Sequence, residues 1–546
     1  MLYFQRVGFL GGISLAAAGL ILLPILAVVG TVFGAAGDTW AHLFRTALGS
    51  YVLNTALLVA GVAAGVISIG VWSAWLVTAY RFPGQRALEW ALMLPLAMPA
   101  YVMAYAYTDW LQFTGPVQES LRALTGWRAR EYWFPEIRSL GGAALLLSFA
   151  FYPYVYLLAR TAFLDTSRGA LEAGRLAGLG AWGSFWRVAL PIARPAIAAG
   201  TALALMETLA DFGTVSYFAL EVFTTGIFKA WLSMGDRLAA GQLSACLLAF
   251  VVLVLALERA SRGRARYASA LRKSARPQRL SGAAAALAFA ACAMPVLLGF
   301  LLPAGLLLQL AWSDLGRTDP HIGARLLTLV GNSFILAGLA AGAGVALATA
   351  MAYAARLSPG RLVAAANRAA SLGYAIPGAV IAVGVLVPLG RLDNWIADGL
   401  EAVFGVKAGL LLTGTLVALV YAYLVRFLAV ALQTVEAGLA KVTPRMDEAA
   451  RSLGATPAQT LARVHAPLLA SSLAAAALLL FVDVMKELPA TFALRPFNFD
   501  TLAIEAYNLA KDERLSEAAL PSLVIVAIGL APLLFVSRRY FQATRS

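Results

Sequence analysis

The segment EAGRLAGLGAWGSFWRVALP, residues 172–191, has a near copy in EAARSLGATPAQTLARVHAP, residues 448–467. The two copies align without a gap at an offset of 276 residues (448 minus 172). The identical pairs are Glu172/Glu448, Ala173/Ala449, Arg175/Arg451, Gly178/Gly454, Arg187/Arg463, Val188/Val464 and Pro191/Pro467. Each copy is a polar, glycine-containing segment between two apolar ones. This repeat predicts that the chain is built from two related halves.

The composition predicts a membrane protein with many spans. Of its 546 residues 61% are apolar and 13% are charged, whereas about a quarter of the residues in a soluble domain are charged. Apolar runs of about 18 or more residues recur, and each is long enough to cross a bilayer as a helix. The net charge of +14 comes from Lys and Arg in short loops beside these runs. That distribution is typical of membrane orientation, so we expect no nucleic-acid partner.

We expect an all-α polytopic protein of about twelve transmembrane helices in two parallel six-helix halves. The predicted spans are 8–33, 50–79, 87–111, 140–162, 196–219 and 240–258, then 283–312, 328–355, 368–390, 407–432, 468–488 and 518–537. The first permease-like half covers residues 1–258 and the second covers 283–546. A basic linker, residues 259–282, joins them. The repeated segments lie in the loops 163–195 and 434–467.

The distribution of Lys and Arg predicts the orientation in the membrane. With both termini in the cytoplasm, the basic linker and both repeated segments also lie there, as the positive-inside rule requires. The halves match elsewhere, since Asn54 aligns with Asn332 and Pro99 aligns with Pro377 at an offset of 278 residues. Six spans per half give both copies the same orientation, as in parallel transporter repeats.

Each repeated segment predicts a helical elbow. An acid lies near the positive N-terminal end of a short helix, a glycine then permits a sharp turn, and a proline marks the start of the next span after a second short helix. The residues concerned are Glu172, Ala173, Gly174, Gly178 and Pro191 in the first copy and Glu448, Ala449, Ala450, Gly454 and Pro467 in the second. Small residues permit close approach of another backbone. Two equivalent copies favour docking to a partner protein over a loop that only lies on the membrane.

The spacing of Glu-Ala-Ala, three further residues and Gly resembles the EAA loop of ABC-type importer permeases, and this chain resembles two such permeases fused. The resemblance covers about residues 50–260 and 328–540. It implies the type I importer permease fold, with two loops that dock in clefts of two copies of an ABC ATPase. It also implies a binding protein that delivers a small solute to the outer face. The departures are Gly174 in place of the second Ala, and Ala466 before Pro467 in place of Leu.

Within that family, three stretches look like those of ferric-iron permeases. They are LPLAMPAYVMAYAY (94–107), ETLADFGTVSYF (207–218) and KELPATFALRPFNFDTLA (486–503). The resemblance therefore implies ferric iron as the solute, with thiamine, polyamine or phosphonate as alternatives. The Walker-type sequence G-x-x-x-x-G-K-[ST] does not occur in the chain. We expect the chain itself to bind no cofactor, and a separate partner subunit to use the ATP.

Ionisable residues fall inside the spans that follow the elbows. Glu207 and Asp211 align with Asp483 and Glu487 at the offset of 276, and Lys486 lies beside the second pair. Residues four apart share one helical face, and a charge at mid-bilayer costs about 2.5–3.5 kcal/mol. These carboxylates must therefore face protein or water. They predict an acidic translocation path for a cation, or alternatively ion pairs that hold helices together.

Tyr101 and Tyr105 are further candidates for the path, although tyrosines also anchor helices at membrane interfaces. We assign no metal site firmly. Two other classes of membrane protein are alternatives. An ion-coupled secondary transporter would need no duplicated docking loop. A membrane-embedded enzyme would need a cluster of His, Cys or Ser, which the sequence does not provide, so we expect no catalytic residues.

Overall fold

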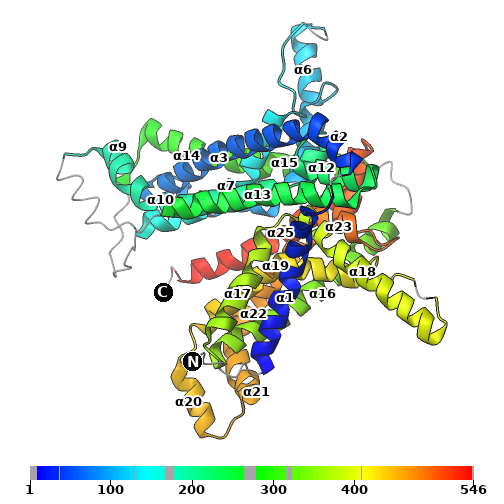
Figure 1. Ribbon diagram of the computed structural model, residues 1–546. Coiled ribbons are helices and arrows are strands. Elements are labelled where there is room, and N and C mark those ends of the chain that lie inside the picture. Colours follow the sequence, from blue (N-terminus) through cyan, green and yellow to red (C-terminus); the bar gives the residue numbers. More distant parts are fainter. Residues whose placement is uncertain are drawn as a thin grey trace. The chain divides into compact units, whose positions relative to one another are not determined.

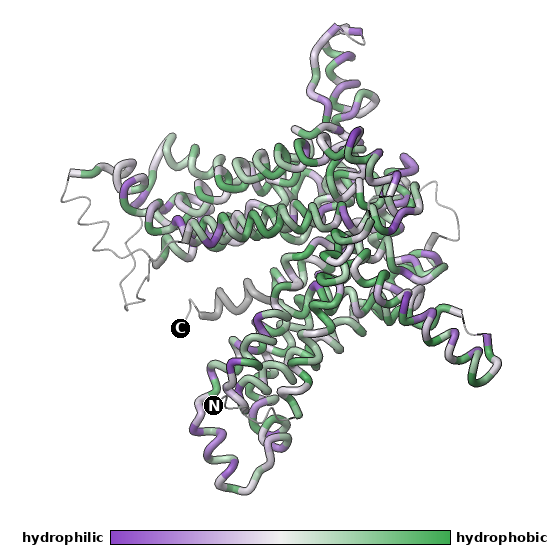
Figure 2. The backbone as a smooth tube through the Cα atoms, viewed as in Figure 1, coloured by the Kyte–Doolittle hydropathy of each residue, from purple (hydrophilic) through white to green (hydrophobic). Residues whose placement is uncertain are grey.

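The computed structural model describes residues 9–35, 37–128, 131–165, 178–262, 278–314, 322–407 and 409–543. Figure 1 labels its elements, and Figure 2 shows apolar residues along the long helices, with polar residues gathered at their ends. In the described part, helices account for the regular structure except for β1 (Tyr80–Arg81) and β2 (Gln278–Arg279), two short strands that pair in parallel. The prediction of an all-α fold is confirmed.

The number of candidate spans agrees with the prediction. Among the described residues, eleven helices are long and apolar enough to cross a membrane, and a bent pair of helices raises the number to twelve. The eleven are α1 (Phe9–Thr31), α3 (Leu48–Ala79), α7 (Leu140–Asp165), α10 (Leu190–Ala210), α13 (Arg237–Arg262), α14 (Gly282–Val296) continued through η4 (Leu297–Leu301) into α15 (Leu302–Asp314), α16 (Ile322–Leu357), α18 (Gly378–Phe404), α19 (Leu416–Leu439), α22 (Ala466–Met485) and α25 (Leu515–Ala543).

The predicted third span is broken by a proline. It consists of α4 (Gln85–Ala91), η1 (Leu94–Ala97) and α5 (Ala100–Leu111), and α5 is followed by α6 (Pro116–Thr125); the bend is 93°. Pro99 stands at the N-cap of α5 because proline disfavours helical geometry in the residue before it. Pro377, its aligned partner, stands at the N-cap of α18 after α17 (Arg361–Ala370) and η5 (Ser371–Ala375). The ninth span therefore begins ten residues later than predicted and ends at Phe404.

The fifth and eleventh spans end earlier than predicted. The sequence predicted ends at residues 219 and 488, whereas α10 ends at Ala210 and α22 at Met485. Short helices follow in each case, which shows that the repeat includes this part of the chain. They are α11 (Gly213–Tyr217) and α12 (Phe223–Phe228) after α10, and α23 (Pro489–Leu494) and α24 (Leu502–Lys511) after α22.

The chain forms two compact units that interleave along the sequence. The first comprises Met1–Ala36, Ala230–Ala245 and Pro320–Glu505, and the second comprises Gly37–Lys229, Cys246–Asp319 and Ala506–Ser546. Helix α1 thus packs with helices that follow residue 320, whereas α14 and α15 pack with helices of residues 48–165. The compact units are defined by the packing of helices against one another, whereas the predicted halves are defined by the repeat in the sequence. The boundaries of the halves at 258 and 283 therefore stay a prediction.

Small residues allow close helix packing inside each unit. In the second unit α3 lies along α7, and a Cβ atom at Gly65 would lie 2.6 Å from the Cβ of Ser148. One at Gly70 would lie 2.8 Å from the Cβ of Val155. In the first unit a Cβ at Gly384 of α18 would overlap the backbone carbonyl of Pro24 in α1. Small side chains bring helices together in lipid, where the hydrophobic effect provides no attraction between them.

Candidate functional site

The second repeated segment folds as the predicted elbow. It consists of α20 (Pro444–Ser452), a turn, α21 (Pro457–Thr460) and a π-helical turn η6 (Leu461–His465) that runs into α22. Gly454 at the turn has a φ of 77°, in the left-handed region where glycine has no Cβ penalty. The local conformation expected from the sequence is therefore found.

The outward side of this elbow offers contacts to a partner. Glu448, Ala449 and Gly454 are exposed, and Ala450 is buried against the rest of the unit. Leu453, beside the turn, is 87% exposed. Pro467 is exposed at the start of α22. An exposed leucine between an acid and a glycine turn is suited to insertion in a groove of another protein.

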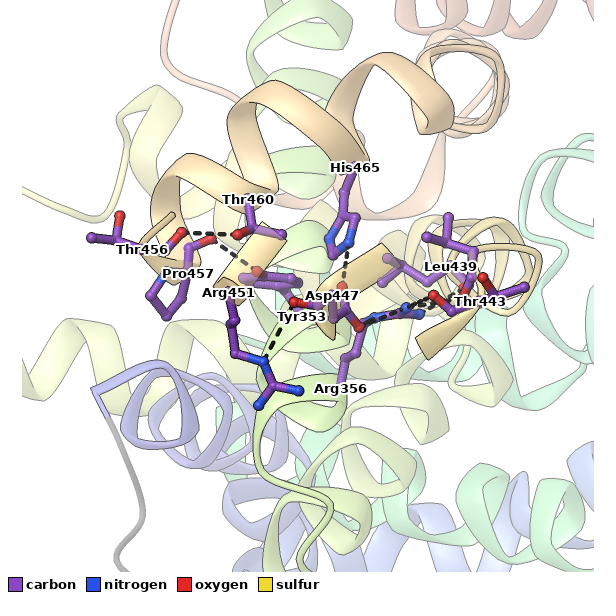
Figure 3. A network of polar contacts seen from close by, with 11 residues as sticks. Tyr353, Arg356, Leu439, Thr443, Asp447, Arg451, Thr456, Pro457, Thr460 and His465 are labelled. Atoms are coloured by element: carbon purple, nitrogen blue, oxygen red, sulfur yellow. Dashed lines mark hydrogen bonds and ion pairs between the residues drawn. The ribbon is translucent and has the colours of Figure 1, made fainter. Parts of the chain in front are cut away.

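Arg356, in the last turn of α16, holds the first arm of the elbow (Figure 3). Its Nε donates to Oδ2 of Asp447 over 2.8 Å. Its Nη1 and Nη2 donate to the carbonyl oxygens of Leu439 and Val442 over 3.0 and 2.9 Å. Arg356 therefore ties the C-terminal end of α19 and the beginning of α20 to one side chain, and it satisfies carbonyls that a helix end leaves without partners.

His465 and Tyr353 hold the second arm (Figure 3). His465 is fully buried, and its Nε2 lies 2.6 Å from Oδ1 of Asp447. The hydroxyl of Tyr353, on α16, donates to the carbonyl of Pro457 over 2.8 Å, and its ring meets the His465 ring edge-on at 5.5 Å. Asp447 thus joins both arms of the elbow to α16. We call Tyr353, Arg356, Asp447 and His465 the elbow network.

The elbow network was not predicted from the sequence, although Asp447 directly precedes Glu448. A weak signal existed, since Arg356 and His465 are isolated polar residues at the ends of apolar spans. Arg356 and its partner Asp447 are 91 residues apart along the chain. No rule of local spacing connects residues at that separation.

The first repeated segment is described only in part. Glu172, Ala173 and Gly174 lie outside the described residues. The described part begins at Gly178, which has a φ of 78°, and continues through α9 (Ala181–Ser184) and a π-helical turn η2 (Phe185–Ala189) into α10, where Pro191 is the second residue. The turn and the second helix therefore repeat those of the other elbow.

Aromatic packing anchors the first elbow where polar contacts anchor the second. The Phe185 ring lies 5.0 Å from the rings of both Trp72 and Trp75 on α3. At the repeat offsets, Trp75 corresponds to Tyr353 and Ala189 corresponds to His465. From the glycine onward the two elbows thus share a backbone path, but they are attached to their units by different physical interactions.

The structure corrects the prediction for the intramembrane carboxylates. Glu207 and Asp483 lie on α10 and α22, but Asp211 and Glu487 follow the ends of these helices. The members of each pair therefore do not share a helical face. Asp211 accepts hydrogen bonds from Thr214 Oγ1 and the Val215 backbone N–H, both over 3.1 Å. It thereby caps α11.

Glu487 caps α23 in the same way and also pairs with a buried arginine. Its oxygens accept from the backbone N–H groups of Ala490 and Thr491, both over 2.9 Å. Nη1 of Arg426, on α19, lies 3.1 Å from Oε1 of Glu487, and both side chains are buried. Lys486 was the cation predicted from the sequence beside these acids, and Arg426 was not predicted. Its signal was a single arginine within an apolar span.

The remaining candidates divide between the compact units. Lys486 Nζ lies 2.8 Å from Oδ1 of Asp483 in the first unit. In the second unit Tyr101 and Tyr105 are buried on α5, with ring centroids 5.8 Å apart, and Glu207 and Asp211 are partly accessible. Among the described residues, no group of three or more His, Cys, Asp or Glu side chains is arranged to hold a metal ion.

Comparisons with known proteins point to transport. Residues 66–262 match the family described as binding-protein-dependent transport system inner membrane component. The chain is 26% identical over 505 residues to the Fe(3+)-transport system permease protein FbpB 2 of Haemophilus influenzae, an alignment that covers 92% of each protein.

Two further relatives match parts of the chain. The sulfate transport system permease protein CysT of Escherichia coli is 29% identical over 247 residues, which cover 43% of this chain and 84% of that protein. The molybdenum transport system permease protein ModB of Escherichia coli is 29% identical over 156 residues, which cover 29% of this chain and 65% of that protein.

Proposed function

Because this chain belongs to the inner membrane components of binding-protein-dependent ABC importers, we propose that it carries ferric iron across the membrane. The observation that supports iron is the extent of the similarity: the relative named for Fe(3+) transport aligns over 92% of this chain, whereas CysT and ModB align over 43% and 29%. As a permease, the protein is a multi-pass inner membrane protein and not an enzyme. An ATPase and a binding protein belong to its system.

The two elbows are the proposed docking sites for two copies of the ATPase. Both contain a left-handed glycine and lead directly into a membrane span, α10 or α22. A rigid connection is required if movement of an ATPase is to reach the span. The elbow network provides it in the second copy and the aromatic packing of Phe185 provides it in the first. The distribution of Lys and Arg supports a cytoplasmic location for both elbows and both termini.

The proposed cycle needs no bond chemistry in this chain. The binding protein releases its solute at the outer face, and ATP binding closes the two ATPase copies. The elbows follow that movement and change the arrangement of α10 and α22, so that the path opens alternately to each side. A carboxylate on the path lowers the cost of a cation in a low-dielectric medium. Asp483 and Glu487 are paired with cationic side chains, whereas Asp211 accepts from a hydroxyl and a backbone N–H, so Asp211 is the better candidate for contact with the solute.

The proposed solute is tested by uptake. Cells that lack other iron importers, supplied with this chain, its ATPase and its binding protein, are expected to take up radioactive ferric iron in an ATP-dependent manner. Labelled sulfate and molybdate are measured in parallel, because relatives named for those anions share part of the sequence. Sulfate or molybdate uptake without iron uptake would show that the solute is an oxyanion. Iron uptake that persists without the ATPase would favour a secondary transporter.

The docking role is tested by charge reversal. The double variant Glu172→Lys and Glu448→Lys is expected to lose the ATPase from the purified complex, because both elbows then present a positive charge where an acid stood. The measurement is the amount of ATPase that co-purifies. The control is Glu119→Lys with Glu401→Lys, which makes the same change in net charge at exposed residues of α6 and α18. Equal ATPase content in both double variants would contradict docking through the elbows.

A further inference from the structure

One carboxylate that is repeated in both halves has different neighbouring side chains in each half. Asp211 and Glu487 occupy equivalent positions, and each caps the short helix that follows its span. The cap explains why an acid stands at this place in both halves. It does not explain why one acid has an arginine partner and the other has tyrosines beside it.

In the second half, Glu487 is neutralised inside the protein. Arg426 lies against it, and Gly378 makes room for the pair, since a Cβ there would lie 2.8 Å from Nη1 of Arg426 and 2.7 Å from Oε1 of Glu487. Close by, the hydroxyl groups of Tyr423 and Thr491 are hydrogen-bonded to each other over 2.5 Å. This arrangement is a closed, charge-balanced structural unit.

In the first half, the acid of that ion pair has an equivalent in Asp211, but the arginine does not. Helices α7 and α19 begin 276 residues apart, at Leu140 and Leu416, so Arg426 corresponds to Ala150. On α5 the first half has tyrosines where the second half has small or aliphatic residues. Tyr101 and Tyr105 correspond at the offset of 278 to Ala379 and Val383 of α18. The first half therefore lacks the arginine and has two phenol groups on α5, the helix that follows Pro99.

These phenols belong to a cluster around Asp211. The ring of Tyr105 lies 5.8 Å from that of Tyr101 and 4.8 Å from that of Tyr217. Tyr105 is close enough to interact electrostatically with Asp211, Tyr101, Tyr217 and Tyr507. The hydroxyl of Tyr507 lies 2.8 Å from that of Ser216. All of these residues belong to the second compact unit.

Within the described part of the chain, the hydroxyl oxygen of Tyr105 lacks the hydrogen-bond partner that a buried hydroxyl with a purely structural role would have. Tyr105 is 2% exposed, and its hydroxyl has no hydrogen-bond partner among the described residues. A buried hydroxyl without a partner costs free energy. Tyr423, a buried tyrosine of the other half, has its hydroxyl hydrogen-bonded to that of Thr491. Asp211, which is partly accessible, caps α11, and α11 packs against the helix α5 that carries Tyr105.

The charges at the edge of the cluster are balanced. Arg138 donates to the hydroxyl of Tyr217 over 3.2 Å, and it also forms an ion pair with Glu513 at 2.8 Å. The carboxylate of Asp211 accepts two hydrogen bonds and retains lone pairs for a further ligand, since an ionised carboxyl has about four acceptor sites. Asp211 therefore offers a carboxylate to a cation, and the charge of Arg138 is balanced by Glu513.

We infer that Asp211 and Tyr105, with the neighbouring phenols of Tyr101, Tyr217 and Tyr507, form a transient site for a hard trivalent cation, and that the first half alone carries it. Hard cations prefer carboxylate and other oxygen ligands. When the cation takes the place of the Tyr105 proton, one O–H bond breaks, one metal–oxygen bond forms and the proton passes to water; no electron moves. Two Asp211 hydrogen bonds keep the site weak, as release requires. The inference rests on the proposed function.

The test uses the full complex, with its ATPase, in lipid nanodiscs and with ferric nitrilotriacetate as the probe. Ferric phenolates absorb visible light through phenolate-to-iron charge transfer, and the wild-type complex is expected to show this band. Tyr105→Phe and Asp211→Asn are expected to reduce the band. In proteoliposomes with the binding protein, both variants are expected to take up about 10- to 100-fold less iron, because a cation without its counter-charge meets a barrier of a few kcal/mol.

The controls distinguish loss of the site from loss of the fold, and failure of the site from failure of the proposed solute. Tyr423→Phe removes an equally buried hydroxyl from the other half and is expected to keep the band, and equal ATPase content shows that Tyr105→Phe is assembled. A wild-type complex without the band, or wild-type iron uptake by Asp211→Asn, overturns the site and leaves iron import standing. A wild-type complex that shows the band but takes up no iron refutes the proposed solute and leaves the site standing.

Discussion

Replacing Asp447 by alanine is expected to weaken binding of the ATPase to the second elbow by about 10- to 100-fold and to reduce transport accordingly. The carboxylate accepts from Arg356 and lies against the buried ring of His465. Hydrogen bonds to charged groups contribute about 1.5–3 kcal/mol, and each 1.4 kcal/mol is a factor of about ten in a binding constant. Without Asp447 the arms of the elbow are no longer joined through one side chain, so docking must first order them.

The measurement is the affinity of the isolated ATPase for the chain in nanodiscs, together with ATP-driven uptake. Asp447→Asn is expected to lie between wild type and alanine, because an amide oxygen still accepts from Arg356 but carries no charge. Asp398→Ala removes an exposed acid from α18 and serves as the matched control. Unchanged affinity in Asp447→Ala would mean that the elbow keeps its conformation without the network, and that the network serves another purpose.

Replacing Arg426 by methionine is expected to destabilise the protein by about 3–5 kcal/mol, because Glu487 is then a buried carboxylate without its cation. Glu487 also caps α23, so the carboxyl cannot move to water without releasing the N–H groups of Ala490 and Thr491. The measurement is thermal or denaturant unfolding of the detergent-solubilised protein, followed by circular dichroism and by retention of ATPase binding.

A matched pair of variants separates charge burial from loss of packing. Lys486→Met removes the cation from a partly exposed ion pair with Asp483 and is expected to cost about 1 kcal/mol or less. The double variant Arg426→Met with Glu487→Gln is expected to recover most of the stability, since it removes both charges and keeps an oxygen that accepts from α23. A double variant as unstable as Arg426→Met alone would show that the guanidinium contributes through packing and not through charge.

The sequence predicted those features of the fold that depend on local chemistry. The apolar runs predicted twelve spans because a helix satisfies its own backbone in lipid whatever surrounds it. Gly178 and Gly454 predicted the turns of both elbows, since a φ near 78° and 77° is accessible to glycine without a Cβ penalty. Hydropathy predicted that α10 and α22 are longer than they are, because a hydropathy scale does not detect a polar side chain that caps the next helix. Asp211 and Glu487 end these spans by binding the backbone of the next short helix.

The sequence by itself determined the helical class of this protein and the positions of the glycine turns at Gly178 and Gly454, because hydropathy and repeated motifs act through residues near one another in the chain. Only the tertiary structure decided which charges neutralise one another. Arg426 reaches Glu487 across 61 residues and Arg356 reaches Asp447 across 91. The packing of α19 beside α22, and of α16 beside α19, sets these distances. Whether a buried carboxylate is a structural cap or a contact for a cation follows from what the packed helices place beside it.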